Sequence, residues 1–373
     1  MTPQRIAGTQ LVLSGALLVL FTGCGIVTGT KAPQPIGTGP TPGAVPVAST
    51  GLQLGLTWLP DRGNLFPILG VSGAAHYGGE VLPTDAQVAT AAAASSSSSS
   101  WALVLKKDST LEEWEFPTSA TITLASRVAL DSNIVFSPSG SCAAVASAST
   151  RRLTLISGLP GKPQASSVAL PSGFVAGNLA VSDNGTVLVG VKQAGNAGVQ
   201  AGVLSETHSY AAVGTLGAWG GVGFLPGTAA DAAVIADAGS GQVAYVTNLS
   251  GTSPVFATLS SGGLLQKPAG VGISPDAKWA FVSDGGKPQV VRLSLATGGP
   301  APAAIACACN PRQMVPLTAD GIYSITSNVA GQPDWLLDIR TSQPRTFFVP
   351  ALAVSASSAT AASNTTQSDR TSR

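Results

Sequence analysis

The residues that most often carry catalysis are scarce in this chain. Histidine occurs only as His76 and His208, which excludes a three-histidine metal site, and no H-E-x-x-H motif is present. The sequence also lacks a G-x-S-x-G nucleophile elbow and a Walker A loop. We expect His76 in a loop between strands and His208 on or beside an outer strand, both in structural roles.

Acidic residues offer the better candidates for a metal site. Segments 233–251 and 280–298 align without a gap, and the alignment matches Asp237 with Asp284 after an apolar strand. Asn328 holds the corresponding place in the last such segment. Three oxygen-bearing side chains on one face would suit a hard cation such as Ca²⁺. The alternative is that they are solvated loop residues.

Four other aspartates follow a different kind of strand and sit in short turns. Asp side chains favour turns because they accept hydrogen bonds from nearby backbone N–H groups. We therefore predict turn formation as the role of these residues, which are Asp61, Asp183, Asp276 and Asp320.

The cysteines call for separate explanations. Cys142 begins the apolar stretch "CAAVAS" and is predicted to be a small buried side chain. Cys307 and Cys309 are separated by one residue, and an oxidising compartment would favour a local disulfide between them. A redox-active pair is the alternative, although no neighbouring His or Lys cluster would lower the pKa of a thiol there.

These residues belong to a repeat of about 45 residues. The stretch "GVGISPDAKWAFVSD" at 270–284 predicts an apolar strand, a tight turn and a second strand. The same order recurs with the turns "SPSG", "SDNG", "LPGT" and "TADG", at steps of 45, 43, 49 and 44 residues. The residues that end the first strand of each copy are Phe136, Val181, Phe224, Ile273 and Leu317. This period is typical of propeller blades, in which one repeat is a four-stranded sheet.

Two earlier copies complete the count. Trp58 precedes "LPDRG" and a strand at 64–69, and Ser95 to Ser100 would form an expanded turn between strands at 87–94 and 101–105. A disordered insertion is the alternative for the six serines. The sequence thus predicts an all-β, seven-bladed β-propeller, with six or eight blades as alternatives. The expected blades are 52–83, 84–128, 129–172, 173–214, 215–262, 263–308 and 309–350.

The way the ring closes is left open by the repeat. "TFFV" at 346–349 could complete the seventh blade alone, or the N-terminal "VPVAS" could supply a strand.

The sixth copy, "VGISPDAKWAFVSDGGKPQVVRLSLATGG", resembles the YVTN-type or WD40-like repeats of exported bacterial β-propellers. The literal "YVTN" at 245–248 falls in the third strand of its copy, whereas the family's tetrapeptide lies in the second. "PILGVSGAAHYGGEVL" and a closing "FFVPA" are also similar to uncharacterised lipoproteins of soil bacteria. The resemblance implies a propeller and no particular activity, because this fold hosts binding proteins and enzymes alike.

The N-terminus has the features of an export signal. Arg5 precedes an apolar run from Leu11 to Phe21, which is too short to span a membrane. "FTGC" at 21–24 resembles the bacterial lipobox, so Cys24 is the expected lipidation site and 1–23 the lipoprotein signal peptide. Acyl chains would hold the protein to a bilayer. Gly25 after the cysteine favours the outer membrane, facing the periplasm or the cell surface.

Composition fits this organisation. The chain has 44 Gly and 26 Pro, only 10% charged residues and a net charge of +1, so turns abound and no surface for nucleic acid is expected. Residues 24–51 predict a flexible tether rich in Gly, Pro and Thr, 52–350 the propeller, and 351–373 a disordered tail.

The sequence therefore predicts a cell-envelope lipoprotein whose propeller is a non-catalytic scaffold for a protein or glycan partner. The alternative is a metal-assisted enzyme of the lactonase or hydrolase kind that uses the carboxylates.

Overall fold

The computed structural model describes residues 52–96, 99–204, 209–227, 231–251, 253–261, 263–326 and 331–352. The predicted signal peptide, Cys24, the tether up to residue 51 and the tail from residue 353 lie outside this part of the chain. The described residues form strands and turns, and they contain no helix long and apolar enough to cross a membrane.

Within the described residues, twenty-seven strands form seven antiparallel sheets, each built from one continuous stretch of chain. The first sheet contains β1 (Gln53–Leu59), β2 (Asn64–Val71) and β3 (Ala74–Tyr77). The second contains β4 (Val88–Ser95), β5 (Ser100–Lys106), β6 (Leu111–Phe116) and β7 (Ala120–Ala125). The third contains β8 (Asn133–Phe136), β9 (Cys142–Ser147), β10 (Arg152–Ser157) and β11 (Gln164–Ala169). The fourth contains β12 (Phe174–Val181), β13 (Val187–Val191), β14 (Val199–Leu204) and β15 (Tyr210–Leu216).

The last three sheets repeat the same plan. The fifth contains β16 (Trp219–Phe224), β17 (Ala233–Asp237), β18 (Gln242–Thr247) and β19 (Val255–Ser261). The sixth contains β20 (Pro268–Ile273), β21 (Trp279–Asp284), β22 (Gln289–Ser294) and β23 (Ala303–Ala306). The seventh contains β24 (Val315–Thr318), β25 (Ile322–Ser324), β26 (Asp334–Asp338) and β27 (Arg345–Val349).

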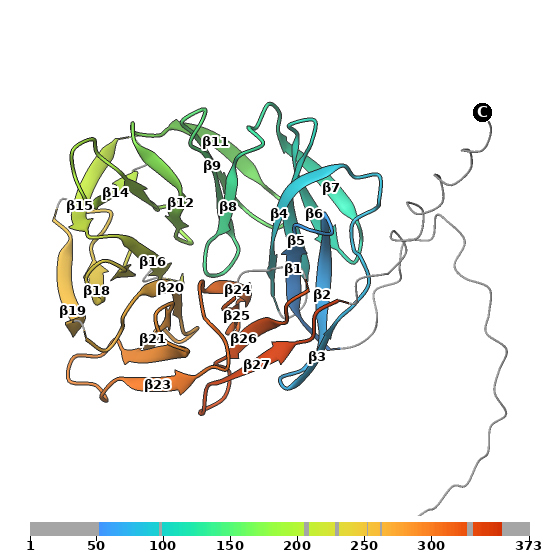
Figure 1. Cartoon of the computed structure of the whole chain (residues 1–373). Helices are drawn as coiled ribbons and strands as arrows, with labels where there is room; N and C mark the ends of the chain where they lie inside the picture. Colours follow the sequence, from blue (N-terminus) through green and yellow to red (C-terminus); the bar gives the residue numbers. More distant parts are fainter. Residues whose placement is uncertain are drawn as a thin grey trace, which may run out of the picture. The chain divides into compact units, whose positions relative to one another are not determined.

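The sheets are the blades of a seven-bladed β-propeller, which confirms the predicted fold. The first strands of the blades contact one another in the order β1, β4, β8, β12, β16, β20, β24 and back to β1. Figure 1 shows the sheets arranged around the axis that these inner strands share, with the red last blade beside the blue first one. Each blade begins at its inner strand and ends at its outer strand.

The turn that follows the inner strand has a repeated mechanism. The hydroxyl of Ser274 accepts hydrogen bonds from the amides of Lys278 (3.2 Å) and Trp279 (3.0 Å). Ser137 and Ser182 do the same in their own blades. All three serines are buried. A buried hydroxyl that satisfies backbone donors explains why Ser recurs at the first turn position.

The serine run lies between β4 and β5, and its two middle residues, Ser97 and Ser98, lie outside the described chain. β4 and β5 pair up to Ser95 and Ser100, and the amide of Ser96 donates to the carbonyl of Ser99 (2.8 Å). The strands on either side of the run therefore pair within one blade, as the expanded-turn prediction requires.

Apolar side chains fill the space between neighbouring blades. The buried residues form seven clusters, and each draws its members from two adjacent blades. Between the fifth and sixth blades, for example, Val234 and Val243 pack with Val271 and Val282. A single blade cannot bury both of its faces, so this stacking is what stabilises each sheet.

The ring closes through side chains in the described part of the chain. Within it, β27 pairs with β26 as the outer strand of a four-stranded seventh blade, and the first blade has three strands. The alternative strand "VPVAS" at 45–49 lies outside the described residues. Leu54, Ile68 and Ala75 of the first blade pack against Leu317 and Phe347 of the last. No strand from one end of the propeller enters the blade at the other end among these residues.

Polar contacts join the same two blades. Ser72 donates to Asp338, and Tyr77 donates to Asp334. The guanidinium of Arg340 donates to the same carboxylate, with Nη2 2.9 Å from Oδ2. We call these five residues the closing clasp.

Candidate functional site

The two predicted metal-ligand aspartates lie where the alignment placed them, at the ends of β17 and β21. Each carboxylate accepts hydrogen bonds from the segment that precedes the inner strand of its own blade. Asp237 accepts from the amides of Gly217 and Ala218, both at 2.9 Å. Asp284 accepts from the amides of Gln266 (3.1 Å) and Lys267 (2.9 Å). These carboxylates tie the entry of a blade to its second strand.

Further donors complete both sets. Gly239 and Ser240 donate to Asp237, and Gly286 and Gln289 donate to Asp284. Burial alone would raise the pKa of each carboxyl, but these hydrogen bonds outweigh it and lower both values.

The predicted cation site at these aspartates stays a prediction, because the structure describes only two of its three residues. Asn328, the third predicted ligand, lies outside the described chain, and the described residues contain no group of three His, Cys, Asp or Glu side chains that could hold a metal ion. With their oxygens occupied by amides and hydroxyls, Asp237 and Asp284 act as structural links.

The turn aspartates have local roles, and one reaches further. Asp276 accepts from the hydroxyl of Ser274 at 2.6 Å within its own turn. Asp183 accepts from the amide of Ser139 in the third blade (2.9 Å) and from the amide of Gly227 in the fifth (3.1 Å). One carboxylate therefore links the turns of three successive blades.

The histidines take no part in a site within the described chain. His76 lies in β3 with its side chain exposed, so the prediction of a loop was wrong. "GAAHYGG" looks like a loop because glycines flank it, but Gly73 forms a tight turn and the four residues between the glycines pair with β2. His208 lies outside the described residues.

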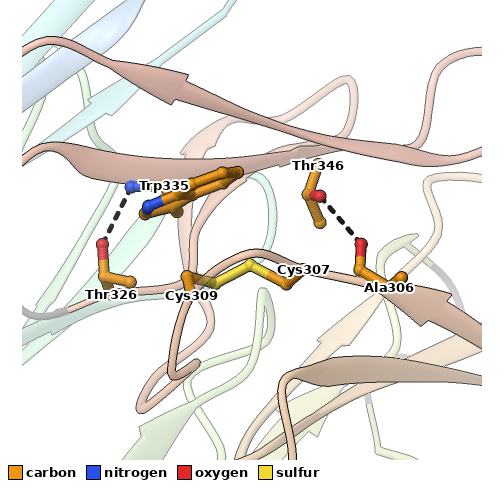
Figure 2. The surroundings of a disulfide bond; sticks show 6 residues. All are labelled: Ala306, Cys307, Cys309, Thr326, Trp335 and Thr346. Atoms are coloured by element: carbon orange, nitrogen blue, oxygen red, sulfur yellow. Dashed lines mark hydrogen bonds between the residues drawn. A yellow bond between two sulfur atoms is a disulfide. The ribbon is translucent and has the colours of Figure 1, made fainter.

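The cysteines are structural. Cys142 is buried in β9, and burial raises the pKa of its thiol. Cys307 and Cys309 form a disulfide directly after β23, where the chain crosses to the last blade. Figure 2 shows Trp335 beside this disulfide and the hydroxyl of Thr346 on β27 donating to the carbonyl of Ala306 (2.9 Å). The disulfide therefore stands at the junction of the sixth and seventh blades.

The central channel is the candidate binding site. It is a cavity of about 700 Å³ lined by residues from all seven inner strands. This volume lies within the range of 300–1,000 Å³ that is usual for small-molecule sites. Because each inner strand is the edge of its sheet, its unpaired backbone N–H and C=O groups face the axis.

The walls of the channel carry no charge. None of the described residues that line it is Asp, Glu, Lys, Arg or His. Its flat apolar surfaces come from Trp58, Phe136, Trp219 and Tyr323, and its polar side chains from Thr57, Asn133, Gln313, Thr318 and Ser324.

The two ends of the channel differ. We call the end at which the inner strands begin the entry end, and the end with the turns that follow these strands the turn end. Trp219 and Asn133 are the first residues of β16 and β8, so they lie toward the entry end. The turn end is rimmed by the prolines of four turns, Pro60, Pro138, Pro226 and Pro275.

The glycine-rich stretch 220–227 serves packing. A Cβ on Gly221 would stand 2.8 Å from the Cα of Gly270, and one on Gly270 would stand 2.4 Å from the amide nitrogen of Met314. Only glycine allows β16, β20 and β24 to approach this closely. The stretch forms most of β16 and part of the turn that follows.

Sequence reasoning did not identify the channel as a site. Its signal was available: the prolines recur at the second position of four turns, and the predicted inner strands contain no charged residue. Only the ring, however, shows that these positions face one cavity.

No family model and no curated protein matches the chain. Solved structures that match include a functionally unknown protein from Desulfotomaculum acetoxidans DSM 771, with 10% identity, 64% of this chain and 75% of that chain covered, and a TM-score of 0.46. Virginiamycin B lyase from Staphylococcus aureus matches with 11% identity, coverage of 69% and 82%, and a TM-score of 0.46. Hydrazine synthase from Kuenenia stuttgartiensis matches with 16% identity, coverage of 64% and 73%, and a TM-score of 0.40. Likenesses this distant carry no argument about activity, and the propeller fold rests on the strand pairing described above.

Proposed function

We propose that this chain is a lipid-anchored protein of the bacterial cell envelope whose propeller binds a protein or glycan partner without catalysing a reaction. The observation that supports it best is the uncharged central channel. General acid–base or nucleophilic catalysis needs titratable groups that touch the substrate. The described lining offers instead aromatic surfaces, amides, hydroxyls and backbone groups.

The hydrolase alternative has less support. It requires carboxylates with free oxygens that face the substrate and hold a metal ion. The carboxylates of Asp237 and Asp284 are occupied by hydrogen bonds within their blades, and neither residue lines the channel.

The envelope location rests on the sequence of the N-terminus and on the disulfide. A Cys307–Cys309 disulfide is stable in an oxidising compartment outside the cytoplasm.

Expression in a bacterial host with labelled palmitate tests the lipid anchor. We expect label and membrane fractionation for the natural chain, and loss of both for Cys24→Ser. Label on Cys24→Ser, or a natural chain without label, would contradict the anchor.

The binding role is tested by closing the channel. Gly177 lines it, and a Cβ added there meets no atom within 4 Å, so Gly177→Phe would fill space without disturbing the wall. Gly79 has equally open surroundings away from the channel, which makes Gly79→Phe the matched control. The immobilised mature protein is incubated with envelope protein and envelope glycan fractions separately. We expect Gly177→Phe to lose retention of one fraction and Gly79→Phe to keep it; equal retention by both would refute the channel as the site.

A further inference from the structure

The channel walls restrict the charge of any ligand that enters. A charged group buried without a partner of opposite sign costs several kcal/mol or more, and the described lining supplies no such partner. Phosphorylated, carboxylated and cationic ligands are therefore disfavoured by the wall itself.

The backbone of the channel wall disfavours ligands that are purely apolar. Seven strand edges present N–H and C=O groups to the axis, and a purely apolar ligand would strip these groups of water and leave them without partners. A suitable ligand must both donate and accept hydrogen bonds along its length while remaining uncharged.

Two amide side chains are held in place near the entry end. The Asn133 amide nitrogen donates to the carbonyl of Ala176 at 3.1 Å. That of Gln313 donates to the hydroxyl of Ser324 (3.2 Å) and to the carbonyl of Thr326 (2.5 Å). These bonds orient both amides, and their carbonyl oxygens accept no hydrogen bond from the described residues. They are neutral acceptors for ligand hydroxyls.

Flat apolar surfaces complete the site. Trp219 lies toward the entry end, and Trp58 and Phe136 lie near the opposite ends of their strands, toward the proline rim. Such rings pack against flat apolar faces of a ligand while its polar groups find partners elsewhere.

We propose that the channel binds a short segment of an uncharged carbohydrate chain. Sugar hydroxyls donate and accept, sugar rings have flat C–H faces, and a neutral glycan brings no charge. This inference rests on the proposed binding function and names the ligand class of the same site.

The test is calorimetric titration of the full mature protein with defined oligosaccharides. The neutral probes are cellohexaose, maltohexaose and xylohexaose, and the charged probes are hexagalacturonic acid and the fully deacetylated chitosan hexamer. We expect at least one neutral hexamer to bind, and both charged ones to bind at least tenfold more weakly. Trp219→Ala should weaken binding of that neutral hexamer by about 3- to 10-fold. Trp335→Phe, outside the channel, should leave it unchanged.

Each other outcome counts against the inference. Absence of binding by all neutral hexamers overturns it, as does equal binding of a charged one or binding that survives Gly177→Phe with the Gly79→Phe control intact. Thermal melts of each variant show that it is folded. If Gly177→Phe still abolishes retention of an envelope fraction while no hexamer binds, the proposed binding function stands and the carbohydrate inference falls.

Discussion

At the scale of single residues, the turns after four of the inner strands place their fourth residue in the left-handed region of backbone space. Three blades have glycine there: Gly140, Gly185 and Gly321 have φ of +76°, +80° and +111°. The sixth blade has Ala277 with φ of +54°. An L-residue with a Cβ is disfavoured in this conformation by about 1–2 kcal/mol.

Ala277→Gly is therefore expected to stabilise the propeller. Glycine loses more freedom on folding, so we expect a net gain of about 0.5–1 kcal/mol in the free energy of unfolding, measured by chemical denaturation. Gly185→Ala, where a Cβ meets only ordinary contact at 3.5 Å, should lose a similar amount. An unchanged or lower stability of Ala277→Gly would contradict the strain argument.

Glu113 is a second residue whose effect on stability can be measured, here through its dependence on pH. Its side chain is buried between the second and third blades; one oxygen accepts from the amide of Gly161 at 2.9 Å and the other has no partner. Burial raises the pKa of this carboxyl above its ordinary value of 4.5, against the opposing effect of the Gly161 amide. The folded protein therefore holds this proton more tightly than the unfolded chain does.

Stability should consequently decrease as pH rises from about 4.5 through the raised pKa. Glu113→Gln removes this titration. As pH rises through that interval, the melting temperature of the variant should therefore rise relative to that of the natural protein. Melting curves between pH 4 and 8 measure it, with Glu80→Gln, which changes an exposed carboxyl away from Glu113, as the control. Parallel curves for Glu113→Gln and the natural protein would be inconsistent with this account.

At the scale of elements, the disulfide stiffens the crossover between the sixth and seventh blades. Cys307 is also anchored through its amide, which donates to the carbonyl of Pro288 at 2.9 Å. The double change of Cys307 and Cys309 to Ser should lower the free energy of unfolding by about 1.5 kcal/mol, the loop-closure value for so short a loop. Urea denaturation measures it. Reductant should reproduce the loss in the natural protein and have no effect on the variant; a natural protein insensitive to reductant would contradict the role assigned to this bond.

The elements also show what sequence can predict. The Ser-Pro-Asp-Ala turn and the equivalent turns in other blades are held by hydrogen bonds between residues at most five positions apart. The turn pattern, the number of blades and the matching positions of Asp237 and Asp284 could therefore be predicted from local sequence. Two of the donors to each of those aspartates come from irregular segments 17 to 20 residues earlier, which no pattern marks. Oxygen-bearing side chains in a loop therefore resemble metal ligands until their partners are known.

Contacts across the ring could not be inferred at all. Tyr77 and Asp334 are separated by 257 positions, and Ser72 and Asp338 by 266. Such pairs, like the convergence of seven uncharged strands on one axis, exist only once the blades close.

At the scale of the whole molecule, stability depends on the junction of the first and last blades. Burial alone would raise the pKa of Asp338, but the hydrogen bonds from Arg340 and Ser72 outweigh it and lower the value to about 2. The ionised carboxylate therefore stabilises the closed ring above pH 3.8, and this contribution is lost as pH falls toward 2.

Asp338→Asn tests the clasp. Asp338 is buried but Arg340 is exposed, so the loss should be smaller than the roughly 3 kcal/mol that is typical of a fully buried pair. We expect a lower melting temperature at pH 7 and a difference that shrinks as pH approaches 2. Asp320→Asn, which removes an exposed carboxylate 3.8 Å from the same guanidinium, should have little effect. A loss for Asp338→Asn that does not vary with pH would point to packing in place of charge.

Closure by side chains has one more consequence. In the described chain the first and last blades share no strand, so parting them leaves each sheet whole and breaks, on the last blade's side, the backbone hydrogen bond from the amide of Ala319 to the carbonyl of Ser95 (3.0 Å). This junction of the first and last blades is also part of the wall of the central channel. A ligand that contacts all seven inner strands would stabilise the closed ring, because its contacts are lost whenever the first and last blades separate. Filling the channel with a ligand and keeping the ring closed are therefore thermodynamically coupled.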